Sequence, residues 1–523
     1  MDERLTFDAL LEERDPGAVM LVAPDGAALS VADFHTLAGK AAAWLRAQGI
    51  ERGDRVALWL PNGVDWLALL FGAARIGAVI VAVNTRYRAA ELDHVLGHSG
   101  ARLLVFGGDD THDDVRKILA EVNLAALGDL ECLASFQPTE PIQGKQVTAI
   151  NLESVEPLGP KDARASDPVL LFTTSGTTSK PKLVQHTQGT VSMHARNCAS
   201  TFGFDAPGAA YLAALPFCGV FGLNPTLAAV VGGAPVHILR AFRDAEAAFA
   251  AKTGKVTHFF GSDEMFRRMW ERDPSAFETA RLCGYASFTP GQAALLQRMA
   301  KSGVPLRGVY GASEVNAIFA IQPSELPVKE RMLGGGRMAG AGRLRVRDPE
   351  SGELVAPGKV GVLEISAETN FTGYFRNAEA TAKAIDEDGF FRSNDLGYER
   401  GDGTFVYLAR NGEFIRLSGF LTDPAEIEEV IARATGVRQA QVVGIEIEGK
   451  VRPVAFVIPD EGSMIDEGAL RAFTEPLLAH YKIPHRFFGL DAFPTTDSAN
   501  GLKIQRGKLA EMARDLIAKG GSR

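Results

Sequence analysis

The sequence contains little of what marks secreted or membrane-spanning proteins. Only four of its 523 residues are cysteines, and their wide spacing predicts neither a disulfide framework nor a close metal-binding pair (Cys132, Cys198, Cys218 and Cys283). No apolar run approaches the roughly 20 residues that a membrane helix needs, and the first stretch, MDERLTFDALLEERD, lacks the apolar core of a signal peptide. We therefore expect a cytoplasmic protein with reduced thiols and no membrane span.

An excess of positive charge is missing as well. The formal net charge is -9 at pH 7, which argues against a protein that binds nucleic acid or an anionic membrane. The charge does not exclude a nucleotide site, because such a site needs only a few local donors. The apolar fraction of 46% and the charged fraction of 23% are ordinary for a globular protein. The length predicts about two to four domains.

The first two thirds of the chain alternate between helix-like and strand-like segments. Apolar residues follow helical spacing over 31–49 and 64–77. Short β-type runs separate and follow these segments (54–60, 78–84, 101–107, 168–173 and 235–239). Such alternation predicts an α/β fold in which helices cover parallel sheets.

Beyond about residue 336 the pattern changes. Strand-like runs joined by Gly, Pro and Asp turns occupy 342–366 and 403–410, which predicts a β-rich subdomain. The pattern then resets into a last segment with a typical α+β order, which predicts a separate domain. Its expected elements are a helix, two strands and a second helix (423–435, 437–447, 451–459 and 467–481). The boundary falls in LARNGEFIRLSG, 408–419, where helix signals are absent.

One loop carries a candidate anion site. In LLFTTSGTTSKPKLVQHTQ, 170–188, Gly176 stands among Ser and Thr residues directly after a strand, with Lys180 and Lys182 behind it. Such a loop can turn its backbone N–H groups toward a phosphate, while the lysines add positive charge. A solvated Ser/Thr turn explains the same composition. The stretch does not fit the G-x-x-x-x-G-K-[ST] loop of nucleotide hydrolases, and from the residues alone both readings stay open.

The motif TSGTTSKPKLV resembles the phosphate loop of the ATP-dependent adenylate-forming (AMP-binding) superfamily, which includes acyl-CoA synthetases, luciferases and peptide-synthetase adenylation domains. Further blocks resemble the same superfamily in the same order along the chain. These are LPFCGVFG (215–222), VYGASE (309–314), the stretch from GYFRNAEATAKAIDEDGFFRSNDLG through LARNGEFIRLSGF, and SANGLKIQRGKL near the C-terminus.

The resemblance implies an architecture and an activity. A large N-terminal adenylation domain would span 1–409, with the β-rich subdomain at about 336–409, and a hinge at 410–412 would join it to a small mobile α+β domain at 413–523. The implied enzyme is an AMP-forming acyl-CoA synthetase, an acid–thiol ligase active as a monomer or homodimer. It would use ATP, Mg²⁺ and coenzyme A to convert a carboxylic acid to acyl-AMP with release of pyrophosphate, and then to acyl-CoA and AMP.

A second implied function is an adenylation domain that loads an acyl group onto the pantetheine of a carrier protein. The loop LPFCG lacks the Asp with which amino-acid-activating relatives bind the substrate ammonium, and this favours free CoA.

The resemblance also implies roles for individual residues. Lys503 would reach the reacting carboxylate and the α-phosphate, Glu314 would bind Mg²⁺, and Thr178 would act with them in the catalytic step. ATP contacts are implied for Thr174, Ser175, Gly176, Thr177, Thr178, Lys182, Tyr310, Gly311, Ser313, Asp395 and Arg410. Ser418 and Gly419 would line the path of CoA, and Gly412 would lie at the hinge, where glycine permits rotation without steering it.

Several positions depart from the pattern of the superfamily. Ser179 and Leu183 replace frequent glycines, Gln188 replaces a frequent His, Asn394 replaces the Gly of Thr-Gly-Asp, and Leu502 separates Gly501 from Lys503. The expected acyl pocket departs most. Candidate walls are Gly219, Phe221, Phe260, Tyr285, Phe288 and Asn316, some of which ordinary core packing would also explain. Because Tyr285 would close a long tunnel and Gly219 would open space, we expect a short, branched or aryl acid.

Overall fold

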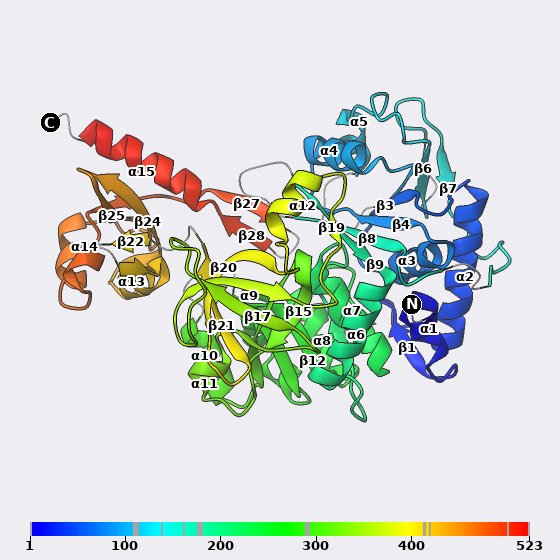
Figure 1. The fold of residues 1–523 in the computed structure, drawn as a ribbon, viewed down its shortest axis with the longest axis horizontal. Helices are drawn as coiled ribbons and strands as arrows, with labels where there is room; N and C mark the ends of the chain where they lie inside the picture. The colour runs from blue at the N-terminus through cyan, green and yellow to red at the C-terminus, as the bar shows by residue number, and fades with distance from the viewer. Residues whose placement is uncertain are drawn as a thin grey trace.

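The computed structural model describes residues 3–107, 115–137, 140–159, 163–174, 181–287, 293–411, 415–417, 420–498 and 501–520. It comprises a large N-terminal α/β domain and a separate small C-terminal domain, as the sequence predicts. Figure 1 shows the small domain, in orange and red, at one end of the long axis of the molecule.

The first sheet of the large domain has eight strands. Its central members are parallel, and the helices α2 (Val31–Ala47) and α3 (Val64–Ile76) match the predicted helical segments. A capping box of Ser30 and Asp33 begins α2, and Gly77 in the left-handed conformation ends α3. The strand order is β19 (Gly373–Tyr374), β9 (Leu183–Thr187), β8 (Pro168–Thr173), β4 (Val79–Ala82), β3 (Arg55–Trp59), β5 (Leu103–Phe106), β6 (Cys132–Ser135) and β7 (Val147–Ala149).

The second sheet has thirteen strands. Their order is β17 (Arg343–Arg347), β18 (Gly361–Ser366), β20 (Phe391–Glu399), β21 (Thr404–Arg410), β16 (Gly334–Met338), β15 (Asn316–Ile321), β14 (Leu306–Ala312), β13 (Leu282–Ala286), β12 (His258–Ser262), β10 (Tyr211–Ala213), β11 (Val236–Ile238), β1 (Val19–Val22) and β2 (Ala28–Ser30). Strands β10 to β14 pair in parallel, whereas β14 to β21 pair antiparallel. The predicted β-rich region is therefore a continuation of this sheet.

Helices separate and cover the two sheets. One continuous core joins the inner faces of both sheets to α2, α3, α6 (Gln188–Phe202) and α7 (Val220–Gly232). On the outer faces, α4 (Ala89–Ser99) and α5 (Val115–Glu121) cover the first sheet, and α8 to α10 cover the second (Asp244–Thr253, Asp263–Arg272 and Ala293–Lys301). This layering leaves the strand ends and the turns between strands as the places where polar side chains meet.

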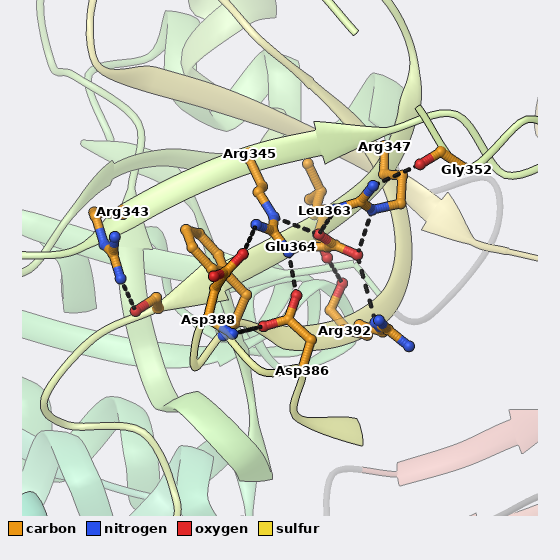
Figure 2. Close-up of polar contacts among 12 residues, drawn as sticks. Arg343, Arg345, Arg347, Gly352, Leu363, Glu364, Asp386, Asp388 and Arg392 are labelled. Atoms are coloured by element: carbon orange, nitrogen blue, oxygen red, sulfur yellow. Dashed lines mark hydrogen bonds and ion pairs between the residues drawn. The ribbon is translucent and has the colours of Figure 1, made fainter. Parts of the chain in front are cut away.

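An ion-pair network joins the outermost strands of the second sheet. Glu364 on β18 is 2% exposed, and its carboxylate accepts from Arg345 Nε at 2.6 Å and Arg347 Nε at 3.0 Å. Figure 2 shows that Arg345 also reaches Asp386 and Asp388, while Arg392 approaches Glu364 from the other side. A buried carboxylate is tolerated only with such partners, so this network ties β17 and β20 to β18.

The small domain contains a three-stranded sheet of β24 (Val437–Ile447), β25 (Lys450–Pro459) and β26 (Arg486–Gly489). Helices α13 (Pro424–Ile431) and α14 (Glu467–Thr474) pack on one face, and α15 (Arg506–Gly520) packs on the other. The predicted helix over 467–481 is wrong beyond Thr474. Pro476 has no N–H to donate to the helix and its ring crowds the carbonyl four residues earlier, so the helix ends before it and a short 3-10 turn, η4 (His480–Lys482), follows.

Among the described residues, no helix combines the length and the apolar content that crossing a bilayer requires.

Candidate adenylation site

Two hydrogen bonds between Thr174 and Lys182 close the base of the candidate phosphate loop. The Thr174 N–H donates to the Lys182 carbonyl at 2.9 Å, and the Lys182 N–H donates to Thr174 Oγ1 at 3.1 Å. These bonds extend the antiparallel pairing of β8 and β9, so Thr174 and Lys182 lie opposite each other. The loop residues Ser175, Gly176, Thr177 and Thr178 lie outside the described part of the chain, as does Ser179.

Lys182 and Glu314 meet through a tyrosine that the sequence did not single out. The Nζ of Lys182 lies 4.0 Å from the centroid of the Tyr374 ring, and the Tyr374 hydroxyl donates to Glu314 Oε1 at 2.7 Å. Tyr374 belongs to β19, which pairs with β9 opposite Val184. Burial and the charge of Glu314 raise the pKa of Tyr374, which keeps its hydroxyl protonated as a donor. The GYFRN segment held the only sequence signal for this residue.

The predicted ribose contacts form a second cluster. Asp395 on β20 and Arg410 on β21 are direct register partners, with Arg410 Nε 3.0 Å from Asp395 Oδ1. The Tyr310 hydroxyl donates to Asp395 Oδ2 at 2.7 Å, and burial raises the pKa of Tyr310 well above its ordinary value. The side chain of Asp395 is only 5% exposed. The structure therefore brings together three of the predicted ATP-binding residues.

Tyr310 also links this cluster to the turn that carries Glu314. Gly311 follows Tyr310 on β14, and a Cβ on Gly311 would lie 2.7 Å from the Cα of Ala317. Only glycine allows the two strands to approach so closely here. Ser313 begins the short 3-10 turn η3 (Ser313–Val315), and its carbonyl accepts from His186 Nε2 at 2.7 Å.

Glu314 has the chemistry of a Mg²⁺ ligand. Mg²⁺ prefers oxygen donors and is commonly held by one or two carboxylates together with substrate phosphates. The Glu314 side chain is half-buried, and within the described chain only its Oε1 is engaged in a hydrogen bond, from Tyr374. The donor set therefore fits the ion.

The loop and helix of the expected acyl pocket are firmly held. Gly219 precedes α7 as its N-cap, and Phe221 in the first turn is buried. The side chain of Asn62 clamps the preceding loop, donating to the Leu215 carbonyl at 2.8 Å and accepting from the Phe217 N–H at 2.7 Å. This region is consequently a well-ordered wall.

The other expected pocket residues divide between the two faces of the second sheet, with Phe260 and Asn316 on the side of α7 and Tyr285 on the other. Phe260 packs edge-on to Phe202 at 5.5 Å, in the core that also contains Phe221. Asn316 is fully buried and contacts α7, accepting from Asn224 Nδ2 at 3.1 Å and donating to the Thr369 carbonyl at 2.9 Å. Tyr285 donates its hydroxyl to the Met332 carbonyl and belongs to the core on the outer face of the second sheet. Adjacent strand positions point to opposite faces, so Tyr285 does not meet Phe221. Phe288 lies outside the described residues.

A cleft of about 190 Å³ lies beside the same loop. It opens at the carboxyl ends of β3, β5 and β6, next to the point where the strand order of the first sheet reverses, which is where α/β sheets commonly bind ligands. Asp65 and Arg240 lie among its lining residues, and Asn62 belongs both to the cleft and to the clamp on the 215–217 loop. The sequence did not indicate it, because its walls come from separate segments.

The predicted catalytic lysine lies in the small domain. The backbone of Lys503 belongs to β28 (Gly501–Ile504), which pairs with β27 (Thr495–Ser498) so that Lys503 lies opposite Thr496. The Lys503 side chain lies outside the described residues, and so do Ser418, Gly419 and Gly412.

A buried ion pair follows the lysine hairpin. Arg506, at the start of α15, lies 2.9 Å through Nη2 from Oε1 of Glu428, which is 4% exposed. Glu428 also accepts from the Val442 N–H at 2.8 Å. The hairpin is thus anchored to the body of the small domain at its exit.

Comparison with known proteins shows the family of the chain. The family described as AMP-binding enzyme matches residues 10–375, and the AMP-binding enzyme C-terminal domain matches residues 426–500. The chain belongs to the AMP-binding enzyme family.

Named members of the AMP-binding enzyme family match nearly the full chain. A feruloyl-CoA synthase from Amycolatopsis sp is 30% identical over 488 residues, covering 91% of this chain and 93% of the relative. A sulfoacetate–CoA ligase from Cupriavidus necator is 30% identical over 502 residues, covering 95% of both chains. A 2-succinylbenzoate–CoA ligase from Geobacillus kaustophilus is 30% identical over 473 residues, covering 88% of this chain and 89% of the relative.

Solved structures share the fold. ATP-bound MatB from Rhodopseudomonas palustris superposes with a TM-score of 0.83 at 24% identity and covers 99% of this chain and 100% of its own. The AMP complex of O-succinylbenzoate coenzyme A synthetase from Bacillus subtilis superposes with a TM-score of 0.80 at 22% identity, covering 96% and 97%. The fold class predicted from the sequence is therefore confirmed.

Three departures from the pattern of the AMP-binding family have structural explanations. Asn394, in place of Gly, has φ +59°, and Asn is among the non-glycine residues that best tolerate this left-handed region. Gln188 is fully buried and ties α3 to α1 (Phe7–Glu12), donating to the Ala74 carbonyl at 2.8 Å and accepting from the Phe7 N–H at 3.1 Å. Leu183 packs in the outer core of the first sheet.

Proposed function

We propose that the protein is an ATP-dependent carboxylate–CoA ligase that forms acyl-AMP and pyrophosphate, and then acyl-CoA and AMP. The observation that carries this proposal is the convergence of Lys182, Tyr374 and Glu314 beside the Asp395–Arg410 pair. The first group supplies a cation and a metal-binding carboxylate for phosphates. The second supplies a buried carboxylate suited to the hydroxyl groups of a ribose.

In the first half-reaction, a substrate carboxylate oxygen attacks the α-phosphorus of ATP, and pyrophosphate leaves. Lys182 and the loop before it hold the β- and γ-phosphates, while Asp395 accepts hydrogen bonds from the ribose. Lys503 offsets the negative charge that develops between the carboxylate and the α-phosphate. Glu314 would hold Mg²⁺, which neutralises phosphate charge when bound.

In the second half-reaction, the thiol sulfur of CoA attacks the acyl carbon and AMP leaves. Here Lys503 is no longer needed. Its place on a hairpin of the small domain supports a division at a hinge around 410–412, with domains at 1–409 and 413–523. Rotation at this hinge would withdraw the lysine and bring Ser418 and Gly419 to the path of the thiol.

The substrate we infer is a compact acid, either short, branched or aryl. The relatives act by name on feruloyl, 2-succinylbenzoate, indoleacetate and sulfoacetate groups, none of which is a long unbranched chain. Phe221 and the clamped loop beside Gly219 supply a rigid apolar wall. Because Tyr285 lies on the other face of the sheet, it does not close the pocket, and the wall at Phe221 and the named relatives support a compact acid.

The test is a panel of acids from acetate to palmitate together with benzoates, phenylacetates and cinnamates. Acid-dependent exchange of pyrophosphate into ATP reports the first half-reaction, and release of AMP with and without CoA reports the second. We expect both with at least one short or aryl acid, with AMP release dependent on CoA.

Two results would contradict parts of the proposal. A preference for palmitate would refute the inferred acid class. Acid-dependent exchange with no CoA-dependent release of AMP would favour the carrier-protein alternative, which a pantetheinylated carrier domain offered as acceptor would then test.

A further inference from the structure

The first residues of β15, directly after the turn that carries Glu314, include two in an unfavourable backbone conformation. Asn316 has φ +60° and Ile318 has φ +56°. A β-branched residue such as Ile rarely adopts a positive φ, and such strain persists only where the surroundings enforce it. Something around this turn therefore holds it in place.

His186 contacts the turn directly. It is fully buried on β9, four residues after Lys182 at the closed base of the phosphate loop, and its Nε2 lies 2.7 Å from the Ser313 carbonyl oxygen. A carbonyl only accepts hydrogen bonds, so Nε2 must carry the proton. Nδ1 faces two possible donors, Thr190 Oγ1 at 3.4 Å and Asn316 Nδ2 at 3.5 Å, in agreement with this tautomer. Burial lowers the pKa of His186 to about 4, so the imidazole stays neutral.

Two side chains of α6 donate hydrogen bonds to the carbonyl groups that follow the turn. His194 Nε2 donates to the Ala317 carbonyl at 2.8 Å, and Cys198 Sγ donates to the Ile318 carbonyl at 3.7 Å. The carbonyl groups of Ser313, Ala317 and Ile318 thus each accept a hydrogen bond from a buried side chain. Since Glu314 directly follows Ser313, the first of these donors has the shortest covalent path to the metal-binding carboxylate.

We propose that His186 is a positioning residue for Glu314, which it orients by donating a hydrogen bond to the Ser313 carbonyl. The proposal rests on the proposed function, because it takes Glu314 as the Mg²⁺ ligand. The hydrogen bonds of His186 go to Ser313, Thr190 and Asn316. Because Ser313 is itself an expected ATP contact, the effect on Glu314 is measured as the metal-dependent part of ATP binding.

The experiment measures the dissociation constant of ATP by isothermal titration calorimetry in excess MgCl₂ and in excess EDTA. The ratio of the two constants isolates the metal-dependent gain. His186→Leu removes the donor, and His186→Gln retains an amide donor of similar reach. We expect the ratio for His186→Leu to fall about tenfold, while His186→Gln stays within about threefold of the wild type.

His258→Leu is the matched control. His258 is also buried, with Nε2 3.0 Å from the Phe202 carbonyl, but this contact lies away from the turn. His258→Leu should lower the free energy of unfolding about as much as His186→Leu does, without changing the ratio of the two ATP dissociation constants. If His186→Leu does not fold, His186→Asn replaces it, because its shorter amide cannot reach Ser313.

An unchanged ratio in a folded His186→Leu or His186→Asn protein would overturn the proposal. So would an equal loss in His258→Leu, or a failure of His186→Gln to restore the ratio. A wild-type ratio near one would also overturn it, since there would be no metal-dependent gain for the turn to control. Failure of the proposed function shows separately, as wild-type protein without acid-dependent pyrophosphate exchange.

Discussion

The Glu314 turn and the Lys503 hairpin are built in opposite ways. The turn joins two strands in the middle of the thirteen-stranded sheet, and buried donors from β9 and α6 hold its carbonyls. The hairpin β27–β28 is a sheet of two strands in the small domain, and it extends toward the large domain (Figure 1). Glu314 thus lies on a turn held by buried side chains of the large domain, whereas Lys503 lies on a hairpin of the small domain.

This difference suits a reaction in two steps. Under the proposed function, the groups that hold the nucleotide are needed in both half-reactions, so they can stay rigidly positioned while the small domain moves. Under the proposed function, a lysine needed in only the first half-reaction would be withdrawn together with its domain.

The largest expected effect is a loss of stability of the large domain in acid. Burial lowers the pKa of His186, His194 and His258 to about 4 each, from an ordinary value near 6.5. The unfolded chain binds these protons below about pH 6.5 while the folded chain does not, so stability is complete above that pH and is lost as pH falls toward 4. Each histidine removes about 1.4 kcal/mol per pH unit over this window, or about 3 kcal/mol in total.

The measurement is denaturant unfolding followed by tryptophan fluorescence at several pH values. All four tryptophans lie in the large domain, at positions 44, 59, 66 and 270, so the signal reports that domain. His258→Gln should flatten the dependence by about one proton's contribution. A free energy of unfolding independent of pH between 6.5 and 4.5 would contradict the neutral buried histidines.

Lys503→Ala removes the ammonium group that we place in the first half-reaction. We expect acid-dependent pyrophosphate exchange to fall by about 10²–10³-fold or more, the usual effect of losing one charge-stabilising group in the transition state. Transfer from supplied acyl-AMP to CoA should stay near the wild-type rate. Lys508→Ala is the control, because Lys508 is an exposed residue of α15 in the same part of the chain. Near-normal exchange in Lys503→Ala would sink the assignment.

Arg506→Met should loosen the anchor of the hairpin. Burial raises the pKa of Glu428 and Arg506 opposes this shift, so the variant leaves a buried carboxylate without its cation. Breaking a buried pair typically costs about 3–5 kcal/mol; with Arg506 26% exposed, we expect about 2–3 kcal/mol. Exchange should fall about tenfold with less effect on acyl transfer.

Adding Glu428→Gln to Arg506→Met should restore most of the stability by removing the uncompensated charge. Arg514→Met, at an exposed position of α15, serves as control. The loss in Arg506→Met should be larger at pH 8 than at pH 5, where Glu428 can take up a proton. Equal losses for Arg506→Met and Arg514→Met would show that the pair does not anchor the hairpin.

Tyr374→Phe should have the smallest effect. It deletes the 2.7 Å hydrogen bond to Glu314 but keeps the ring beneath Lys182. A hydrogen bond to a charged group contributes about 1.5–3 kcal/mol at most, and water can replace the hydroxyl at this half-buried carboxylate. We therefore expect a KM for ATP a few-fold higher with the KM for the acid unchanged. A change in the acid KM alone would place Tyr374 in a different role.

Local pattern was sufficient for much of the fold. The spacing of apolar residues predicted α2 and α3, whose caps and covered faces follow from the same residues. It failed at α14, where helical spacing continued past Pro476 although the backbone cannot. Periodicity reports which face is apolar and says little about where a helix stops.

The candidate site shows the same limit more clearly. Motif blocks placed Lys182, Glu314, Asp395 and Arg410 in one site, and the contacts of Asp395 agree with that grouping. Tyr374 was missed although it lies inside a quoted block, because nothing local marks which of its residues faces Glu314. Tyr285 was expected in the acyl pocket, and strand alternation turns it to the opposite face of the sheet instead.

By itself the sequence determined the family, the alternation of helices and strands, and the residue types available for phosphate, metal and ribose. These are properties of short segments, set by spacing and by the chemistry of each side chain. Only the tertiary structure decided which of these residues meet. The contact of His186 with Ser313 spans 127 residues of sequence and that of Tyr374 with Glu314 spans 60. Such pairs form only when separate strands and turns pack into one core.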